Sequence, residues 1–214
     1  MERYAHRGLH GNDVAENTMK AFENAVEAGI GIELDVRLTA DGKLAVFHDS
    51  TLKRLVKGDN RAISTLTADE LKEVRLKDGS QIPMLFEVLE LVEGKVPLLI
   101  EIKTQSKVLS SLRTEKALIE ELKGYTGEYR VQSFNAMAVN YCRRHLKAES
   151  GRLSGDMYSC RRCGDFVSYK LSQLTREKVK RFREKGLKIY GWGVYDESKA
   201  EKLAKELGID GIII

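Results

Sequence analysis

Apolar and β-branched runs alternate with segments of helical periodicity along most of the chain. The runs predict eight strands, at Arg3–His6, Ile30–Val36, Pro97–Ile102, Arg130–Ser133, Gly151–Asp156, Asp165–Ser168, Lys188–Gly193 and Asp210–Ile214. The periodicity predicts helices at Glu16–Ala28, Leu85–Val92, Lys107–Lys123, Ala136–His145, Arg176–Lys185 and Glu197–Leu207. Such alternation is typical of a parallel sheet, because parallel neighbours need a crossover connection. Eight strands favour a (β/α)8 TIM barrel, and an open doubly wound sheet is the alternative.

One stretch interrupts the alternation after the second predicted strand. A hairpin is indicated over Arg37–Phe47, with its turn at Asp41-Gly42. The polar, partly helical segment 49–82 follows it. We therefore expect a single domain over residues 1–214, with a small insertion that caps the carboxyl-terminal mouth of the barrel.

Composition narrows the class of protein without naming a function. The 214 residues are 42% hydrophobic and 32% charged, which is typical of a soluble globular domain. The net charge of +4 is mild and evenly spread, so it does not indicate a nucleic-acid partner. No apolar run reaches the ~20 residues that a membrane helix needs. A homodimer is compatible with the sequence.

The amino terminus and the cysteines indicate a compartment. Met1 to Tyr4 lead directly into a strand-like segment, so we expect no signal peptide. Three cysteines, an odd number, do not form a secreted disulfide framework. We expect a cytoplasmic protein.

Three carboxylates interrupt or end buried strands. Glu33 and Asp35 lie two residues apart on a strand, so both side chains point to one face, about 6–7 Å apart along it. Glu101 interrupts the apolar run of the next predicted strand. A buried charge needs a partner, and oxygen ligands suit hard cations. We predict that the trio binds Mg²⁺ or Ca²⁺.

Two histidines and two cations occupy neighbouring strand ends. His6 and His48 could serve as general base and general acid, since imidazole titrates near neutral pH. Arg7 offers a planar fork for phosphate oxygens, and Lys103 offers a compact positive charge. Asp49 could orient His48 or cap the next turn, and we assign it no role.

Nine short motifs in this order resemble the glycerophosphodiester phosphodiesterase family over nearly the full chain. They are His6-Arg7-Gly8, Glu16-Asn17-Thr18, Glu33-Leu34-Asp35, Thr39-Ala40-Asp41-Gly42, His48-Asp49, Pro83-Met84-Leu85, Glu101-Ile102-Lys103, Gln132-Ser133-Phe134 and Trp192. The resemblance implies a TIM barrel that hydrolyses glycerophosphodiesters to sn-glycerol 3-phosphate and an alcohol, with a metal ion.

The resemblance also implies a role for each matching residue. Glu33, Asp35 and Glu101 would bind the metal, the two histidines would be the acid/base pair, and Arg7 and Lys103 would hold the phosphate. Two further residues are assigned to the substrate pocket. These are Asn17, which would brace the His6 loop or touch the ligand, and Trp192, which would line the glycerol end or only pack in the barrel.

The sequence departs from the family where the alcohol would bind. The common Trp-Thr-Val-Asn strand appears here as Trp192-Gly193-Val194-Tyr195, so a hydroxyl and an amide are missing. A lysophospholipase D-type enzyme is therefore an alternative, although the polar insertion offers little apolar groove. A non-catalytic phosphate- or metal-binding barrel is a third candidate, and the two histidines disfavour it, because binding alone needs no proton-transfer pair.

The cysteines suggest a second site. Cys142 and His145 are three apart on a predicted helix, and Cys160 and Cys163 form a Cys-x-x-Cys pair. Together they could bind a structural Zn²⁺, which the family resemblance does not imply. One core cysteine and a surface pair is the simpler interpretation, and a redox pair is a third.

Overall fold

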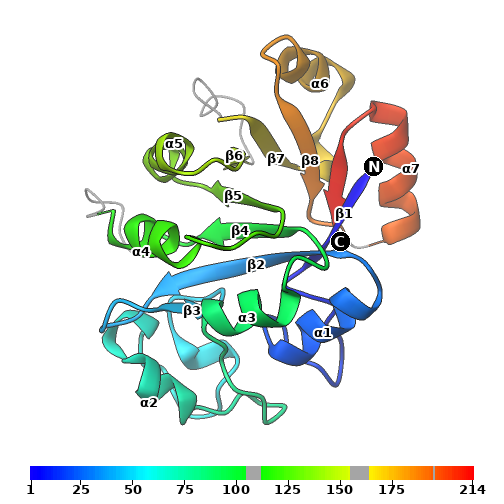
Figure 1. Ribbon diagram of the computed structural model, residues 1–214. Coiled ribbons are helices and arrows are strands. Elements are labelled where there is room, and N and C mark those ends of the chain that lie inside the picture. The colour runs from blue at the N-terminus through cyan, green and yellow to red at the C-terminus, as the bar shows by residue number, and fades with distance from the viewer. Residues whose placement is uncertain (105–111, 155–163, 195) are drawn as a thin grey trace.

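The computed structural model describes residues 1–104, 112–154, 164–194 and 196–214, and in it the strands form a closed barrel (Figure 1). The strands are β1 (Glu2–His6), β2 (Gly31–Leu38), β3 (Leu44–Val46), β4 (Leu98–Ile102), β5 (Tyr129–Ser133), β6 (Ser150–Ser154), β7 (Phe166–Lys170), β8 (Lys188–Trp192) and β9 (Gly211–Ile213).

Closure depends on the two terminal strands. Parallel ladders run in the order β1-β9-β8-β7-β6-β5-β4-β2, and β1 also pairs with β2. Glu2 is opposite Gly211 in the β1–β9 ladder, and His6 is opposite Glu33 in the β1–β2 ladder. The TIM barrel is confirmed. The open doubly wound sheet is wrong, because an open sheet would leave two unpaired edges.

The described helices pack around the outside of the barrel, except for the short helix of the insertion (Figure 1). They are α1 (Met19–Glu27), α2 (Ala68–Lys72), α3 (Leu85–Val92), α4 (Arg113–Glu121), α5 (Ala136–His145), α6 (Arg176–Arg183) and α7 (Glu197–Leu207). The helix expected from Glu16 begins later because Thr18 caps it, its hydroxyl accepting from the Ala21 amide. Part of the helix expected over Lys107–Lys123 lies outside the described residues. No described helix is long and apolar enough to cross a membrane.

Aromatic rings fill the barrel at the level below the carboxyl ends of the strands. Tyr190 makes edge-to-face contacts with Tyr4 and Phe166, at centroid distances of 6.0 and 5.3 Å. Gly151 leaves room for one ring, since a Cβ there would lie 2.2 Å from Phe166. Arg130 lies beside this layer and donates to the Tyr4 hydroxyl at 2.6 Å. This packed layer supports the polar groups above it.

The insertion has a hydrophobic cluster of its own. β3 pairs antiparallel with β2, which confirms the hairpin. The segment 49–82 continues through the 3₁₀ turns η1 (Leu52–Arg54) and η2 (Ile63–Thr65) to α2. Its apolar side chains pack with Phe47 and Met84 rather than with the barrel helices. The insertion therefore has a fixed shape that can place side chains at the barrel mouth.

Candidate active site

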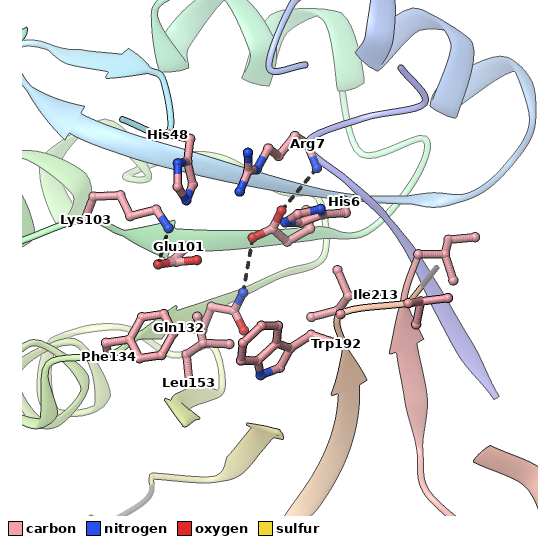
Figure 2. Close-up of a pocket in the computed structure, with 14 residues that line it drawn as sticks. His6, Arg7, His48, Glu101, Lys103, Gln132, Phe134, Leu153, Trp192 and Ile213 are labelled. Atoms are coloured by element: carbon pink, nitrogen blue, oxygen red, sulfur yellow. Dashed lines mark hydrogen bonds and ion pairs between the residues drawn. The ribbon is translucent and has the colours of Figure 1, made fainter. Parts of the chain in front are cut away.

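A cavity of about 400 Å³ opens at the carboxyl ends of the barrel strands. In Figure 2 the charged side chains gather on one side of it and apolar side chains lie across from them. Its lining residues come from both ends of the chain: His6, Arg7, Glu33, His48, Glu101, Lys103, Gln132, Phe134, Leu153, Trp192, Gly193, Val194, Ile213 and Ile214. Ligand sites of TIM barrels form at this end, where the strand-to-helix loops meet.

The three predicted metal ligands come together. Glu33 and Asp35 share one face of β2, and Asp35 is the ladder partner of Glu101 on β4. Their carboxylate oxygens lie within 4.8 Å of one another, and all three residues are buried. Strand alternation and ladder register thus produce an oxygen-rich cluster.

Burial and repulsion make this cluster costly for the fold. Burial, followed by the charges of Asp35 and Glu101, raises the pKa of Glu33 well above its usual value. Burial and the charge of Asp35 raise the pKa of Glu101 to about 7. Burial would also raise the pKa of Asp35, but nearby Lys103, His48 and Arg7 hold it below its usual value. A cation among these oxygens would relieve the repulsion.

The two predicted phosphate-binding side chains border the cluster. The Lys103 ammonium lies 3.0 Å from Asp35 and 2.6 Å from Glu101. The Arg7 guanidinium lies 2.7 Å from Glu16 and 3.4 Å from Asp35. Both side chains line the cavity, so a phosphate there would meet two positive charges beside the carboxylates.

Both predicted histidines also line the cavity. The Nδ1 atom of His48 lies 2.6 Å from Asp49, so Nδ1–H donates to that carboxylate and Nε2 keeps a free lone pair. Desolvation lowers the pKa of His48, and desolvation with the charge of Arg7 lowers the pKa of His6 to about 4. Both rings are neutral near pH 7 and can accept a proton. Asp49 orients His48, which is one of the two roles that the sequence left open.

Two amides hold the carboxylates in place. Asn17, in the left-handed region at φ 55°, donates to Asp35 at 2.9 Å and accepts from its backbone amide at 3.4 Å. Gln132 donates to Glu33 at 3.3 Å and accepts from the Ser168 hydroxyl at 2.7 Å. The Arg7 backbone amide donates to the other oxygen of Glu33. Asn17 therefore contacts a predicted metal ligand.

The opposite wall of the cavity is apolar. Trp192 and Phe134 meet edge to face at 6.4 Å, beside Leu153 and Ile213 (Figure 2). Phe134 is 49% exposed. The Nε1–H of Trp192 is buried and has no hydrogen-bond partner within the described ranges. Trp192 thus contributes a packing contact to the apolar wall of the cavity.

Known proteins resemble this chain over nearly its full length. A model of the glycerophosphoryl diester phosphodiesterase family matches residues 6–214. A glycerophosphodiester phosphodiesterase from Caldanaerobacter subterraneus subsp. tengcongensis is 34% identical over 230 residues, covering 98% of this chain and 91% of the relative. The chain belongs to the glycerophosphoryl diester phosphodiesterase family.

Two further proteins resemble this chain, one in structure and one in sequence. A phosphodiesterase from Oleispira antarctica, solved in complex with the product sn-glycerol-3-phosphate, has a TM-score of 0.88 and 26% identity, covering 100% of this chain and 92% of that one. Human lysophospholipase D is 36% identical over 139 residues, which cover 58% of this chain and 42% of the relative.

The sequence alone assigns no role to three polar residues in and around this site. They are Gln132 and Glu16, which occur within the family motifs, and Arg54 of the insertion, which pairs with Glu16 and Asp49. Gln132 follows apolar Val131 within β5, so strand alternation could have placed it inside the barrel. No local pattern distinguishes Arg54, since its partner Glu16 lies 38 residues away.

The first half of the predicted zinc set lies away from this site. Cys142 is fully buried in the hydrophobic core, and burial raises the pKa of its thiol to about 12. His145 is exposed, stacks on Tyr141 and bonds the Tyr141 carbonyl through Nδ1 at 2.8 Å. Cys160 and Cys163 lie outside the described residues. The zinc site stays a prediction.

Proposed function

We propose that this chain hydrolyses glycerophosphodiesters to sn-glycerol 3-phosphate and an alcohol, with Mg²⁺ or Ca²⁺ as cofactor. The observation that carries the proposal is the buried trio of Glu33, Asp35 and Glu101 beside Arg7 and Lys103 at one cavity. Negative and positive groups side by side suit a metal-phosphate ligand better than either ion alone. Family membership and a relative solved with sn-glycerol-3-phosphate support the same substrate.

The carboxylate trio fits a divalent cation. Three buried oxygen donors within 4.8 Å of one another suit a hard ion, and thiolate or imidazole ligands for a softer metal are absent from this described cluster. The raised pKa values of Glu33 and Glu101 report the charge that such an ion would compensate. When bound, the ion would polarise a phosphoryl oxygen.

The two histidines would move the protons. One neutral imidazole accepts the proton of the attacking hydroxyl as its oxygen bonds to phosphorus. Attack by water gives sn-glycerol 3-phosphate in one step, whereas attack by a hydroxyl of the glycerol gives a cyclic phosphate that a water molecule then opens to the same product. The bond from phosphorus to the alcohol oxygen breaks, and the other imidazole donates a proton to that oxygen. This second imidazole takes the proton up from solvent when the negative charge of the bound phosphodiester favours its protonated form. Arg7 and Lys103 balance the charge that builds on the phosphoryl oxygens. For His48, the bond to Asp49 presents Nε2 for this transfer.

The test is hydrolysis of glycerophosphocholine, glycerophosphoethanolamine and glycerophosphoglycerol, with EDTA, Mg²⁺ or Ca²⁺. We expect release of sn-glycerol 3-phosphate only with a divalent cation, and a loss on the order of 10²–10⁴-fold in kcat for His6→Ala and for His48→Ala. Unchanged hydrolysis by either variant would refute the histidine pair. Equal rates in EDTA, after the protein is stripped of metal, would refute the metal requirement.

A lysophospholipase D-type activity is the second candidate. The apolar wall of Trp192, Phe134 and Leu153 favours it, as does the similarity to human lysophospholipase D. The polar insertion predicts little apolar surface at the barrel mouth. The apolar wall instead comes from strands β6 and β8 and from the residue after β5, across the barrel from the carboxylates. Comparing kcat/KM for glycerophosphocholine and lysophosphatidylcholine separates the two, since only the second substrate would gain from apolar contacts.

A further inference from the structure

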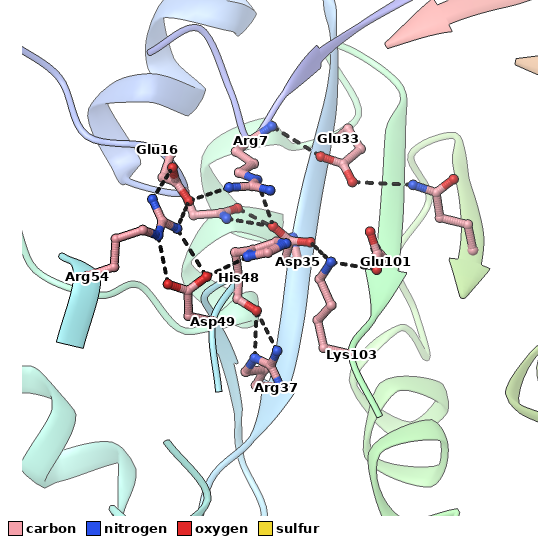
Figure 3. A network of polar contacts seen from close by, with 12 residues as sticks. Arg7, Glu16, Glu33, Asp35, Arg37, His48, Asp49, Arg54, Glu101 and Lys103 are labelled. Carbon is pink, nitrogen blue, oxygen red and sulfur yellow. Dashed lines mark hydrogen bonds and ion pairs between the residues drawn. The ribbon is translucent and has the colours of Figure 1, made fainter. Parts of the chain in front are cut away.

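A continuous chain of hydrogen bonds and ion pairs joins a proposed proton carrier to a proposed phosphate ligand (Figure 3). It begins at His48, whose Nδ1 bonds Asp49 at 2.6 Å. Arg54 contacts Asp49 at 2.7 Å and Glu16 at 2.6 Å. Glu16 in turn contacts the Arg7 guanidinium at 2.7 Å. The insertion supplies Asp49 and Arg54, and loops at the barrel mouth supply the other members.

Arg54 uses both edges of its guanidinium. Its Nε and Nη2 atoms donate to the two oxygens of Asp49, at 2.7 and 3.2 Å. Its Nη1 and Nη2 atoms donate to the two oxygens of Glu16, at 2.8 and 2.6 Å. A planar fork that binds two carboxylates in this way fixes their relative position and plane, which a lysine ammonium cannot do.

Arg54 therefore fixes the position of both carboxylates, and each carboxylate in turn orients a residue of the cavity. Asp49 then fixes the plane and tautomer of His48, and the Arg37 side chain bonds the His48 carbonyl at 2.8 and 2.5 Å from the other side. Glu16, only 12% exposed, fixes the Arg7 guanidinium at the cavity wall. Arg54 itself does not line the cavity.

We propose that Arg54 is a positioning residue, which sets His48 and Arg7 relative to one another through Asp49 and Glu16. The inference rests on the roles proposed above for His48 and Arg7. It also assigns a function to the insertion. Leu52, fully buried in the insertion's hydrophobic cluster, anchors the 3₁₀ turn that carries Arg54 to the barrel mouth.

Stability alone does not explain this arrangement. The Arg54 side chain is 44% exposed, so solvent screens its pairs, although this bidentate network contributes more to folding than an isolated surface pair. The orientation of reacting groups is far more sensitive, since a displacement of about 1 Å can cost on the order of 10²-fold in rate. Removing Arg54 should therefore lower activity much more than it lowers the unfolding temperature.

The first experiment compares Arg54→Gln and Arg54→Lys with a matched control. Arg61 pairs with both oxygens of Asp59 on the same insertion and does not line the cavity, so Arg61→Gln is the control. For Arg54→Gln we expect a fall on the order of 10²-fold in kcat/KM for glycerophosphocholine, with an unfolding midpoint that is only slightly lower than that of wild type. Arg54→Lys should fall in between, and Arg61→Gln should match wild type. Wild-type kcat/KM in Arg54→Gln would overturn the inference.

The second experiment asks whether Arg54 acts through Asp49. If it does, the double variant Asp49→Asn/Arg54→Gln loses no more activity than the worse single variant. Millimolar guanidinium should also restore part of the activity of Arg54→Ala and leave wild type unchanged, which loss of fold would not allow. Fold losses that multiply, or no rescue by guanidinium, would overturn the inference. Wild-type activity in His48→Ala would instead refute the role proposed above for His48, and no hydrolysis of glycerophosphodiesters by the wild-type protein would refute the proposed function, whatever Arg54 does.

Discussion

At the scale of single residues, the orientation of Glu33 depends on two neighbouring hydrogen-bond donors. One oxygen accepts the Arg7 backbone amide and the other accepts the Gln132 side chain. The Ser168 hydroxyl donates to Gln132 in turn, so the amide cannot flip without losing a bond. Such outer contacts orient a ligand for its metal almost as strictly as the fold does.

We therefore expect Gln132→Met to weaken metal binding without removing a ligand. Methionine keeps the volume but donates no hydrogen bond to Glu33, so the dissociation constant for Mg²⁺ or Ca²⁺ should rise on the order of 10-fold or more. Isothermal titration calorimetry of the metal-free protein measures it. Ser168→Ala, one bond further away, is the control and should change the constant less. Equal constants for Gln132→Met and wild type would show that this amide does not orient Glu33.

At the scale of elements, strand β6 can pair with β7 because Gly151 has no side chain. Gly151 faces Phe166 in the ladder, and an added Cβ would lie 2.2 Å from the ring. Gly151→Ala should therefore lower the free energy of unfolding by about 1–3 kcal/mol or more. Urea denaturation measures this. Gly151→Ala/Phe166→Leu should recover part of the loss, and Gly11→Ala, with no heavy atom within 4 Å of the new Cβ, should cost little.

Helix α4 carries a buried carboxyl group that should make stability depend on pH. Glu115 is 1% exposed, its Oε1 has no hydrogen-bond partner in the described part of the chain, and burial raises its pKa. The folded state therefore holds a proton more tightly than the unfolded chain does. Stability falls as pH rises from the unfolded pKa, near 4.5, to the raised folded value, and is then constant.

Glu115→Gln removes this loss. We expect the variant to exceed wild type by about 1 kcal/mol in unfolding free energy at pH 8, and the difference to disappear near pH 4, where Glu115 is protonated in both states. Urea titrations at the two pH values test this. Glu120→Gln on the exposed side of α4 is the control and should shift neither. A difference that grows toward low pH would have the wrong sign and contradict the account.

At the scale of the whole molecule, the local hydrophobic pattern predicted the barrel but not the hydrogen bonds between residues that are far apart in the sequence. Helices α3, α5 and α7 begin and end at the predicted residues, because each is amphipathic. Strand alternation placed Glu33 and Asp35 on one face correctly. By contrast, the contact of Gln132 with Glu33 spans 99 residues, and no local spacing encodes it. Hydrogen bonds of this kind can be predicted only when the order of the strands in the closed sheet is known.

The strand order also predicts how a metal ion should affect the fold as a whole. The trio bridges β2 and β4, so an ion bound there crosslinks two neighbouring strands and binds only the folded chain. At 100 times its dissociation constant such an ion adds about 2.7 kcal/mol to the unfolding free energy. We expect Mg²⁺ or Ca²⁺ to raise the midpoint of thermal unfolding above its value in EDTA. Asp35→Asn and Glu101→Gln should lose most of that rise, whereas Glu120→Gln should keep it. An equal rise in all four proteins would place the ion elsewhere on the molecule, and the assignment of the trio as the metal site would then be wrong.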